Sequence, residues 1–316
     1  MSIGSLAIPS STAGLAAGSY PVKFGRPRLL IVGCGDVGMR VLRQLRRTAG
    51  RWQVLVLSSS PGRLAELRGA GARVLMGNLD QADTLARLGG VADVVLHLAP
   101  PASSGAEDRR TANLLRALAR SQSPKRLIYA STTGVYGDCQ GARLDESRPA
   151  APSTDRARRR VDAEQRIRRF GAEHGTAVTI LRIPGIYASD RIGGHPRERL
   201  ARGSPVLRRE DDVFTNHIHA DDLARACVLA LSKGPNQRVL HVCDDSEMLM
   251  GDYFDLAADL CGLPRPQRVS RAQAQELMSP MQLSFMSESR RLINQRLKTE
   301  LGLRLLYGQI AAGLVA

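Results

Sequence analysis

Three glycines near the beginning of the chain have the spacing G-x-G-x-x-G at 33–38. They lie between a short apolar run and an amphipathic stretch, so the sequence predicts a strand, a tight turn and a helix. Such a turn has no side chain where a diphosphate must approach the backbone, and the N-terminus of the helix attracts negative charge. We therefore predict that the turn binds the pyrophosphate of a dinucleotide. The predicted contacts are Gly33, Gly35, Asp36, Val37 and Gly38.

The end of the second predicted strand bears on the choice between NAD(H) and NADP(H). An acidic side chain there would bind the ribose 2′-hydroxyl of NAD, but the sequence reads S-S-S-P-G-R at 58–63. No carboxylate in this segment repels a 2′-phosphate, and serine hydroxyls and a guanidinium could bind one. We therefore predict that Ser58, Ser59 and Arg63 favour NADP(H), with NAD(H) as the alternative. Arg63 could instead be a solvated helix residue.

A second group of residues has side chains that bind metals: His217, His219, Asp221 and Asp222. Asp221 and Asp222 also lie where the next predicted helix begins, and an aspartate there caps the free N–H groups of a helix. We assign the aspartates to capping and predict no metal site.

The elements that must position these residues alternate along the chain between short apolar runs and amphipathic stretches. Strands are predicted at 29–32, 54–57, 74–76, 94–98, 126–130, 178–181 and 239–242. Helices are predicted at 36–47, 61–70, 81–89, 106–121, 156–174, 196–202, 220–232, 251–262 and 287–300. Continuously apolar strands that alternate with helices indicate a parallel sheet covered on both faces. The predicted fold class is α/β, a doubly wound parallel sheet (Rossmann fold) with a smaller C-terminal substrate subdomain.

Composition divides the chain into three parts. Residues 1–26 are rich in Ser, Ala, Gly and Pro and hold no acidic residue, so we predict a flexible tail. No basic residue precedes Lys23, which argues against a secretory signal. We predict a dinucleotide-binding domain at 27–182 and a substrate-binding subdomain at 183–316, with 214–245 returning to the sheet.

The net charge of +15 raises the question of a nucleic-acid partner. All but four of the 45 basic residues are arginines, they are spread along the whole chain, and aromatic residues make up only 4%. Nucleic-acid binding proteins usually cluster their charge and offer stacking rings, so we predict an anionic small-molecule ligand instead. No apolar run is long enough for a membrane span. The five cysteines lack a C-x-x-C spacing, which is typical of free thiols in a cytoplasmic protein.

Five further segments resemble those of extended short-chain dehydrogenase/reductases, a family of nucleotide-sugar epimerases and dehydratases. They are G-N-L-D at 77–80, H-L-A at 97–99, S-T-T-G-V-Y-G at 131–137, L-R-I-P-G-I-Y at 181–187 and I-H-A-D-D-L-A at 218–224. The resemblance implies that Asn78 and Leu79 lie beside the adenine ring, and that Leu98 and Ala99 line the nicotinamide side. It also implies that Thr132 holds the position of the active-site hydroxyl. Members of this family often form homodimers, so the resemblance allows a homodimer here and leaves the oligomeric state open.

One departure from this family concerns the proton donor. Its members use a Tyr-x-x-x-Lys pair, and the matching positions here hold Arg156 and Arg160. An arginine stays protonated near neutral pH, so Arg156 cannot act as the acid and base, whereas Arg160 could still hold the ribose or a phosphate. Thr132 could orient a substrate carbonyl or simply bond to the backbone at the strand end. Tyr136 is the candidate substitute donor, with a packing role as its alternative.

Two hypotheses of function follow. The first is an NAD(P)-dependent oxidoreductase or epimerase-like enzyme that acts on an anionic or sugar-like substrate. The second is a non-catalytic NADP(H)-binding sensor or regulator, which the absent Tyr-Lys pair favours.

Overall fold

The computed structural model describes residues 1, 25–47 and 51–315, so the tail predicted at 1–26 lies almost entirely outside the described residues. Its centre is a seven-stranded sheet in the order β12-β7-β5-β4-β1-β2-β3. The strands are β1 (Arg28–Val32), β2 (Gln53–Ser58), β3 (Arg73–Met76), β4 (Val94–His97), β5 (Arg126–Thr132), β7 (Ala177–Ile183) and β12 (Arg238–His241). All neighbouring strands in this sheet are parallel. The predicted doubly wound α/β class is therefore confirmed.

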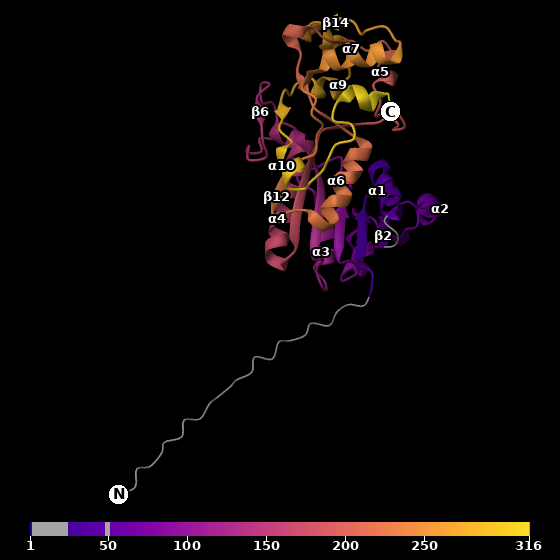
Figure 1. Cartoon of the computed structure of the whole chain (residues 1–316), viewed down its shortest axis with the longest axis vertical. Coiled ribbons are helices and arrows are strands. Elements are labelled where there is room, and N and C mark those ends of the chain that lie inside the picture. The colour runs from indigo at the N-terminus through magenta and orange to yellow at the C-terminus, as the bar shows by residue number, and fades with distance from the viewer. Residues whose placement is uncertain (2–24, 48–50, 316) are drawn as a thin grey trace.

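Alternate residues of each strand face opposite helical layers. Leu29 and Ile31 belong to a buried cluster with α1 (Asp36–Arg47) and α6 (Ala220–Lys233). Leu30 and Val32 belong to a second cluster with α3 (Arg109–Leu118) and α4 (Asp155–His174). Burying one such side chain contributes about 1.5–3 kcal/mol, which explains why these strands are apolar on both faces. Figure 1 shows these helices flanking the sheet.

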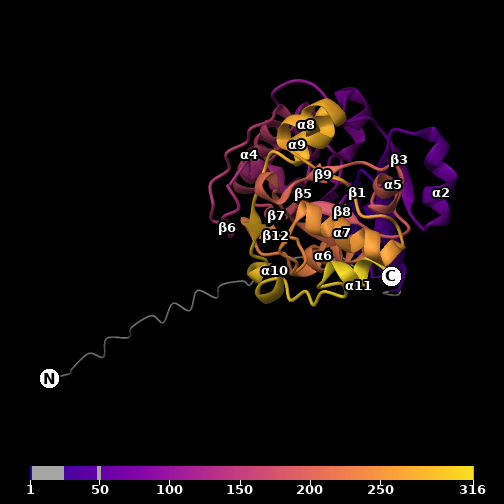
Figure 2. The ribbon, with the colours of Figure 1, turned by 90° about the horizontal axis from the view of Figure 1, so that it is seen from above.

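A smaller group of elements lies above the strand ends and has its own buried cluster. Figures 1 and 2 both show these helices over one edge of the sheet. The helices are α5 (Arg197–Ala201), α7 (Met250–Cys261), α8 (Arg271–Leu277), α9 (Pro280–Phe285) and α11 (Ile310–Leu314). The short strands pair as β8 (Gly185–Tyr187) with β11 (His217–His219), β9 (Val206–Leu207) with β14 (Arg268–Val269), and β10 (Phe214–Thr215) with β13 (Met248–Leu249).

Short elements complete the described chain. The 3₁₀ turns are η1 (Pro61–Arg63), η2 (Ala82–Leu88), η3 (Thr133–Tyr136) and η4 (Arg209–Asp211). The remaining elements are α2 (Leu64–Gly69), β6 (Arg143–Leu144), β15 (Arg291–Leu292) and α10 (Gln295–Thr299). The helix predicted at 81–89 is thus entirely 3₁₀, and the helix predicted at 61–70 begins with a 3₁₀ turn.

The helix predicted at 287–300 is wrong over most of its length. Residues Arg291–Leu292 form a strand that pairs with β6 instead. The backbone N–H of Arg291 donates to Ala142 O at 3.0 Å, and that of Ile293 donates to Leu144 O at 3.0 Å. Long-range strand pairing therefore overrides the local helical pattern, and only α10 is helical here.

A buried ion pair joins β7 to α4, and Ser131 at the end of β5 bonds to the same carboxylate. Arg182 and Glu164, both nearly inaccessible to solvent, are joined by bonds of 2.7 Å and 3.1 Å. Ser131 donates its hydroxyl to the same carboxylate at 2.5 Å. Burial lowers the pKa of Arg182, but its bonds to Glu164 raise that pKa above the ordinary value overall. The network fixes the strand end that carries Thr132.

No helix among the described residues has the length and apolarity that a membrane crossing requires. All five cysteines are free thiols, as their spacing predicted.

Candidate functional site

The glycine turn joins β1 to α1, and two of its glycines are required by the protein itself. Gly33 has φ +85°, and a Cβ there would lie 2.4 Å from the backbone nitrogen of Ala99. A Cβ on Gly38 would lie 2.9 Å from Cys34 Sγ. These two glycines therefore allow the tight turn and the close packing of helix on strand.

Gly35 differs, because a Cβ on it would meet nothing within 4 Å. Its backbone faces open space directly before α1 begins at Asp36. The first N–H groups of a helix have no carbonyl partner within the helix, so they can bind an anion in such a space. The residues of the turn therefore fit a diphosphate. The packing of the protein does not require a glycine at position 35, but a side chain there would fill the space in front of the helix.

The expected 2′-phosphate segment already has internal partners. Arg63 Nη1 donates to Cys34 O at 2.5 Å, while Nε and Nη2 donate to Glu66 at 2.8 Å and 3.0 Å. The bonds to Glu66 raise the pKa of Arg63. Ser58 Oγ accepts from the backbone N–H of Ser60 at 3.2 Å, and Ser59 is exposed. Arg63 thus extends from η1 to the glycine turn, and Glu66 is a neighbour that the sequence reasoning missed.

The residues that the resemblance placed beside the cofactor follow β3 and β4. Asn78 Oδ1 accepts from the N–H of Asp80 at 3.0 Å, and Leu79 O accepts from Asn113 at 2.9 Å. The N–H groups of Leu98 and Ala99 both donate to Val32 O, at 2.7 Å and 3.0 Å. Because carboxyl ends of parallel strands meet at one edge, these residues lie on the same edge as the glycine turn.

His97 ends β4 and is fully buried. Its Nε2 is 2.9 Å from Thr111 Oγ1, and burial lowers its pKa to about 3. His97 is therefore a buried, hydrogen-bonded residue of the core.

A cavity of about 820 Å³ opens between the sheet and the smaller group of elements. Its volume is within the range of small-molecule sites. Thr132 lines it from the end of β5, and its Oγ1 also accepts from the N–H of Gly134 at 3.3 Å. Thr132 therefore bonds to the backbone, as one of its two predicted roles required, and it also belongs to the cavity lining. Its role toward a substrate stays a prediction.

Tyr136 lies within the core rather than on the wall of this cavity. It is 2% exposed, and its hydroxyl is 2.5 Å from His241 Nε2. The Arg182 guanidinium lies 4.7 Å from its ring centroid. Burial raises the pKa of Tyr136 to about 12. To donate a proton to a substrate, this hydroxyl would have to leave His241.

The two arginines at the positions of the expected Tyr and Lys point to different places. Arg156 lines the cavity, with its guanidinium 5.7 Å from the Phe285 ring centroid. Arg160 donates from Nη1 to Ala130 O at 2.7 Å and to Tyr129 Oη at 3.0 Å. Arg160 therefore supports the end of β5, whereas Arg156 adds a cation to the cavity.

Arg199, which sequence reasoning missed, adds a further cation to the cavity. Its guanidinium lies 4.4 Å from the Phe254 ring centroid and donates to Pro205 O at 3.1 Å. Its Nε is buried without a hydrogen-bond partner among the described residues, and burial lowers its pKa. Among the described residues, the lining holds a single carboxylate, Glu288, which pairs with Arg290 at 2.8 Å. The cavity therefore suits an anionic ligand.

The predicted capping of α6 is wrong. His219 is the capping residue, since its Nδ1 accepts from the N–H of Asp221 at 3.2 Å. Asp222 instead accepts from the N–H groups of Leu306 and Tyr307, at 3.0 Å and 2.9 Å, which ties a distant segment to the helix. Within residues 25–47 and 51–315, no group of three or more potential ligands could hold a metal.

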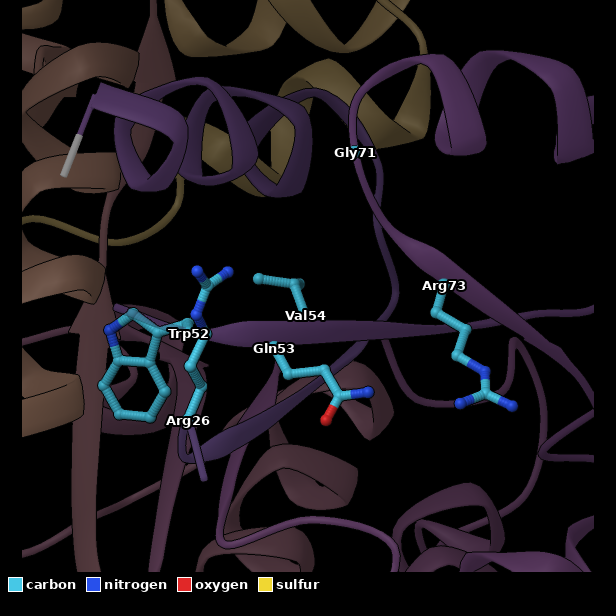
Figure 3. A pocket seen from close by; sticks show the side chains of 6 residues that line it. All are labelled: Arg26, Trp52, Gln53, Val54, Gly71 and Arg73. Carbon is cyan, nitrogen blue, oxygen red and sulfur yellow. The ribbon is translucent and has the colours of Figure 1, made fainter. Parts of the chain in front are cut away.

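A second hollow, of about 460 Å³, lies at the beginning of β2 and β3 (Figure 3). Its lining residues are Arg26, Trp52, Gln53, Val54, Gly71 and Arg73. These residues are at the amino ends of the strands, opposite the edge that holds the glycine turn. Ligands of doubly wound sheets bind at the carboxyl ends, so we assign this hollow no role.

A family model for the NAD dependent epimerase/dehydratase family matches residues 29–243. Protein YeeZ of Escherichia coli K12 is 27% identical over 251 residues, which cover 76% of this chain and 86% of YeeZ. A solved structure of a functionally unknown conserved protein from Silicibacter pomeroyi is 30% identical, with a TM-score of 0.76 over 91% of this chain and 96% of that chain. A double mutant of DesIV, a dTDP-glucose 4,6-dehydratase from Streptomyces venezuelae solved with NAD bound, is 23% identical, with a TM-score of 0.73 over 91% of this chain and 94% of that chain. This last likeness shows a shared fold.

The open space at Gly35 gives a direct test of the glycine turn. We expect Gly35→Val to retain the thermal unfolding temperature of the wild type, because a Cβ meets nothing within 4 Å. The same side chain should weaken dinucleotide binding by roughly 10²-fold, since it occupies the space that the diphosphate needs. Calorimetric titration measures the affinity. Gly69→Ala, also with open space around its Cβ, is the control that should bind normally. Unchanged affinity in Gly35→Val would contradict the assignment.

Proposed function

The chain belongs to the NAD-dependent epimerase/dehydratase family, and on that basis we propose that it is an NAD(P)-dependent oxidoreductase or epimerase-like enzyme acting on an anionic, sugar-like substrate. The main support for this proposal is that the glycine turn lies next to the cavity lined by arginines. Arg191 lines that cavity and also bonds to Asp36 of the turn at 2.7 Å. A dinucleotide on the turn and a substrate in the cavity would therefore be neighbours. A homodimer and a cytoplasmic location stay predictions.

The charge of the cavity supports an anionic substrate. Arg156 and Arg199 lie on its wall, and no carboxylate pairs with either among the described residues. Arg156 is exposed, whereas Arg199 is half-buried. A guanidinium without a carboxylate partner favours a ligand that brings a phosphate or carboxylate, and burial makes this stronger for Arg199. The neighbouring aromatic rings of Phe285 and Phe254 give the ligand an apolar surface as well. A charged sugar derivative meets both requirements.

The dinucleotide supplies the hydride acceptor or donor at its nicotinamide when bound. This chain's own residues would orient the substrate, and we propose Thr132 for that role because this residue lines the cavity at the end of β5. The proton would come from Tyr136 or from water in the cavity. Water needs no rearrangement, whereas Tyr136 must first give up its bond to His241.

Replacing Thr132 tests the proposed orienting hydroxyl. We expect Thr132→Val to lower kcat/KM by roughly 10²-fold, since one positioned donor typically contributes that much to the transition state. Thr132→Ser keeps a hydroxyl and should retain most of the activity. The measurement is nicotinamide absorbance with a panel of sugar nucleotides and anionic carbonyl compounds. Equal activity in Thr132→Val and the wild type would exclude this role.

We propose NADP(H) as the preferred cofactor, with NAD(H) as the alternative. Residues 58–63 contain no carboxylate, and Arg63 lies beside the turn with donors that could shift toward a 2′-phosphate. Glu66 opposes this, because it already holds Arg63 through two bonds. Preference for NADP(H) therefore requires the phosphate to compete with Glu66 for the guanidinium.

Titration with NADPH and NADH measures this preference. We expect Arg63→Gln to weaken NADPH binding by roughly tenfold and to leave NADH binding nearly unchanged, because only NADPH carries the 2′-phosphate. Glu66→Gln should strengthen NADPH binding, since it frees the guanidinium. Loss of both affinities alike in Arg63→Gln would show that this residue supports the turn instead.

A second function, that of a non-catalytic NADP(H)-binding sensor, is favoured by Arg156. This residue replaces the expected tyrosine and keeps its positive charge near neutral pH.

The variant Arg156→Tyr/Arg160→Lys separates the two functions. If the wild type binds cofactor without turnover, the sensor hypothesis predicts that this double variant gains activity on sugar nucleotides or anionic carbonyl compounds. If the wild type turns over, the enzyme hypothesis predicts that the double variant loses substrate affinity, because the cavity loses the Arg156 cation. Nicotinamide absorbance and substrate KM distinguish these outcomes.

A further inference from the structure

Asp36 places a carboxylate inside the turn that would hold a diphosphate. It is the first residue of α1 and directly follows Gly35. A negative side chain this close to a diphosphate repels it, and the repulsion is strong where protein surrounds the charges. The structure shows that two arginines cover this carboxylate. Arg40 Nε lies 3.2 Å from Oδ1, and Arg191 Nη1 lies 2.7 Å from Oδ2.

The two arginines come from different parts of the chain. Arg40 is one turn along α1 and is 3% exposed, whereas Arg191 follows β8 and lines the substrate cavity. Arg40 also bonds to Asp190, the neighbour of Arg191, and to Asp221 at 2.7 Å. Its pKa is lowered by burial but raised overall by these carboxylates. Asp190 and Arg191 thus form crossed ion pairs with Arg40 and Asp36.

The crossed pairs connect the substrate side of the molecule to the cofactor turn. Gly193, Gly194 and His195, just beyond Arg191, line the same cavity. Arg191 is therefore the point at which the wall of the cavity contacts the turn. Without Arg191, Asp36 would retain Arg40 as its partner, but Arg40 is shared with Asp190 and Asp221. The turn would then carry uncompensated negative charge.

We propose that Arg191 is a positioning residue for the dinucleotide, because it neutralises Asp36 and so allows a diphosphate to bind at Gly35. This inference rests on the proposed function, since it concerns the same cofactor. It adds that cofactor affinity depends on a residue of the substrate cavity. A substrate that draws Arg191 away from Asp36 would weaken cofactor binding, and by linkage the cofactor would weaken the binding of that substrate equally.

A double-mutant cycle tests the charge relation. NADPH and NADH are titrated by calorimetry into the wild type, Arg191→Gln, Asp36→Asn and Asp36→Asn/Arg191→Gln. We expect Arg191→Gln to weaken binding of whichever dinucleotide the wild type binds by about tenfold, and Asp36→Asn to bind at least as tightly as the wild type. The double variant should return to within about threefold of Asp36→Asn, because no carboxylate is left to neutralise.

Two matched variants separate charge from shape. Arg191→Lys keeps the cation and should retain most of the affinity. Arg197→Gln removes an exposed arginine of α5 that does not line the cavity, and it should bind like the wild type. Thermal unfolding without ligand shows which variants are folded. If Arg191→Gln is not folded, Asp36→Asn still tests the proposal, because weaker binding by that variant contradicts it.

The contradicting outcomes are distinct. Wild-type affinity in Arg191→Gln would show that Asp36 needs no second cation. A double variant as weak as Arg191→Gln would show that Arg191 contacts the phosphates directly and that its relation to Asp36 is incidental. A wild type that binds neither dinucleotide would overturn the proposed function and this inference together, whereas the other two outcomes leave the function intact.

Discussion

The close approach of the β1–α1 turn to the end of β4 is the constraint on which the rest of the molecule depends. Gly33 and Ala99 are so close that no Cβ fits between them. The carbonyl of Val32 accepts from the N–H groups of both Leu98 and Ala99, so the ends of β1 and β4 are joined there. This contact fixes the position of α1, whose N-terminus follows the open space at Gly35. It also places Asp36 and Arg40 of α1 where they form ion pairs with Arg191 and Asp190.

Most strand predictions succeeded because the central strands are buried on both faces, although the edge strand β3 is only partly buried. Leu29, Leu30, Ile31 and Val32 alternate between two helical layers, and a continuous apolar run is what such burial requires. The failed helix at 287–300 is the opposite case. Its strand residues, Arg291–Leu292, are determined by partners near residue 143, and no local pattern carries that information.

Two helices were missed although their beginnings are visible in the sequence. Ser270 and Gln273 form a capping box at α8, and Ser279 and Gln282 form another at α9. A serine followed three residues later by glutamine is the expected pattern for such a start. In the candidate site, the glycine spacing and the apolar run and amphipathic stretch on either side of it predicted the turn. The bond from Asp36 to Arg191 joins residues 155 positions apart, so only the folded chain could show it.

Several arginines in the described part of the chain form hydrogen bonds that a lysine would replace less well. Arg160 donates to Ala130 O, Arg290 to Gly137 O and Arg291 to Gly141 O, so their guanidinium groups fix loops and strand ends. A guanidinium has several donors in a rigid plane and can bind carbonyls and a carboxylate together, which an ammonium does less well. Much of the positive charge is therefore committed to internal bonds.

Arg156 is the arginine whose surroundings differ from this pattern. Its guanidinium lies over the Phe285 ring at the cavity wall rather than against a carbonyl. Replacing an acid by a permanent cation there removes a proton donor, but it also stabilises negative charge on whatever lies beside it. A substrate whose reacting group becomes anionic would gain from that cation without receiving a proton from the protein. The cavity therefore offers positive charge to an anionic group, whereas the source of the proton stays a proposal.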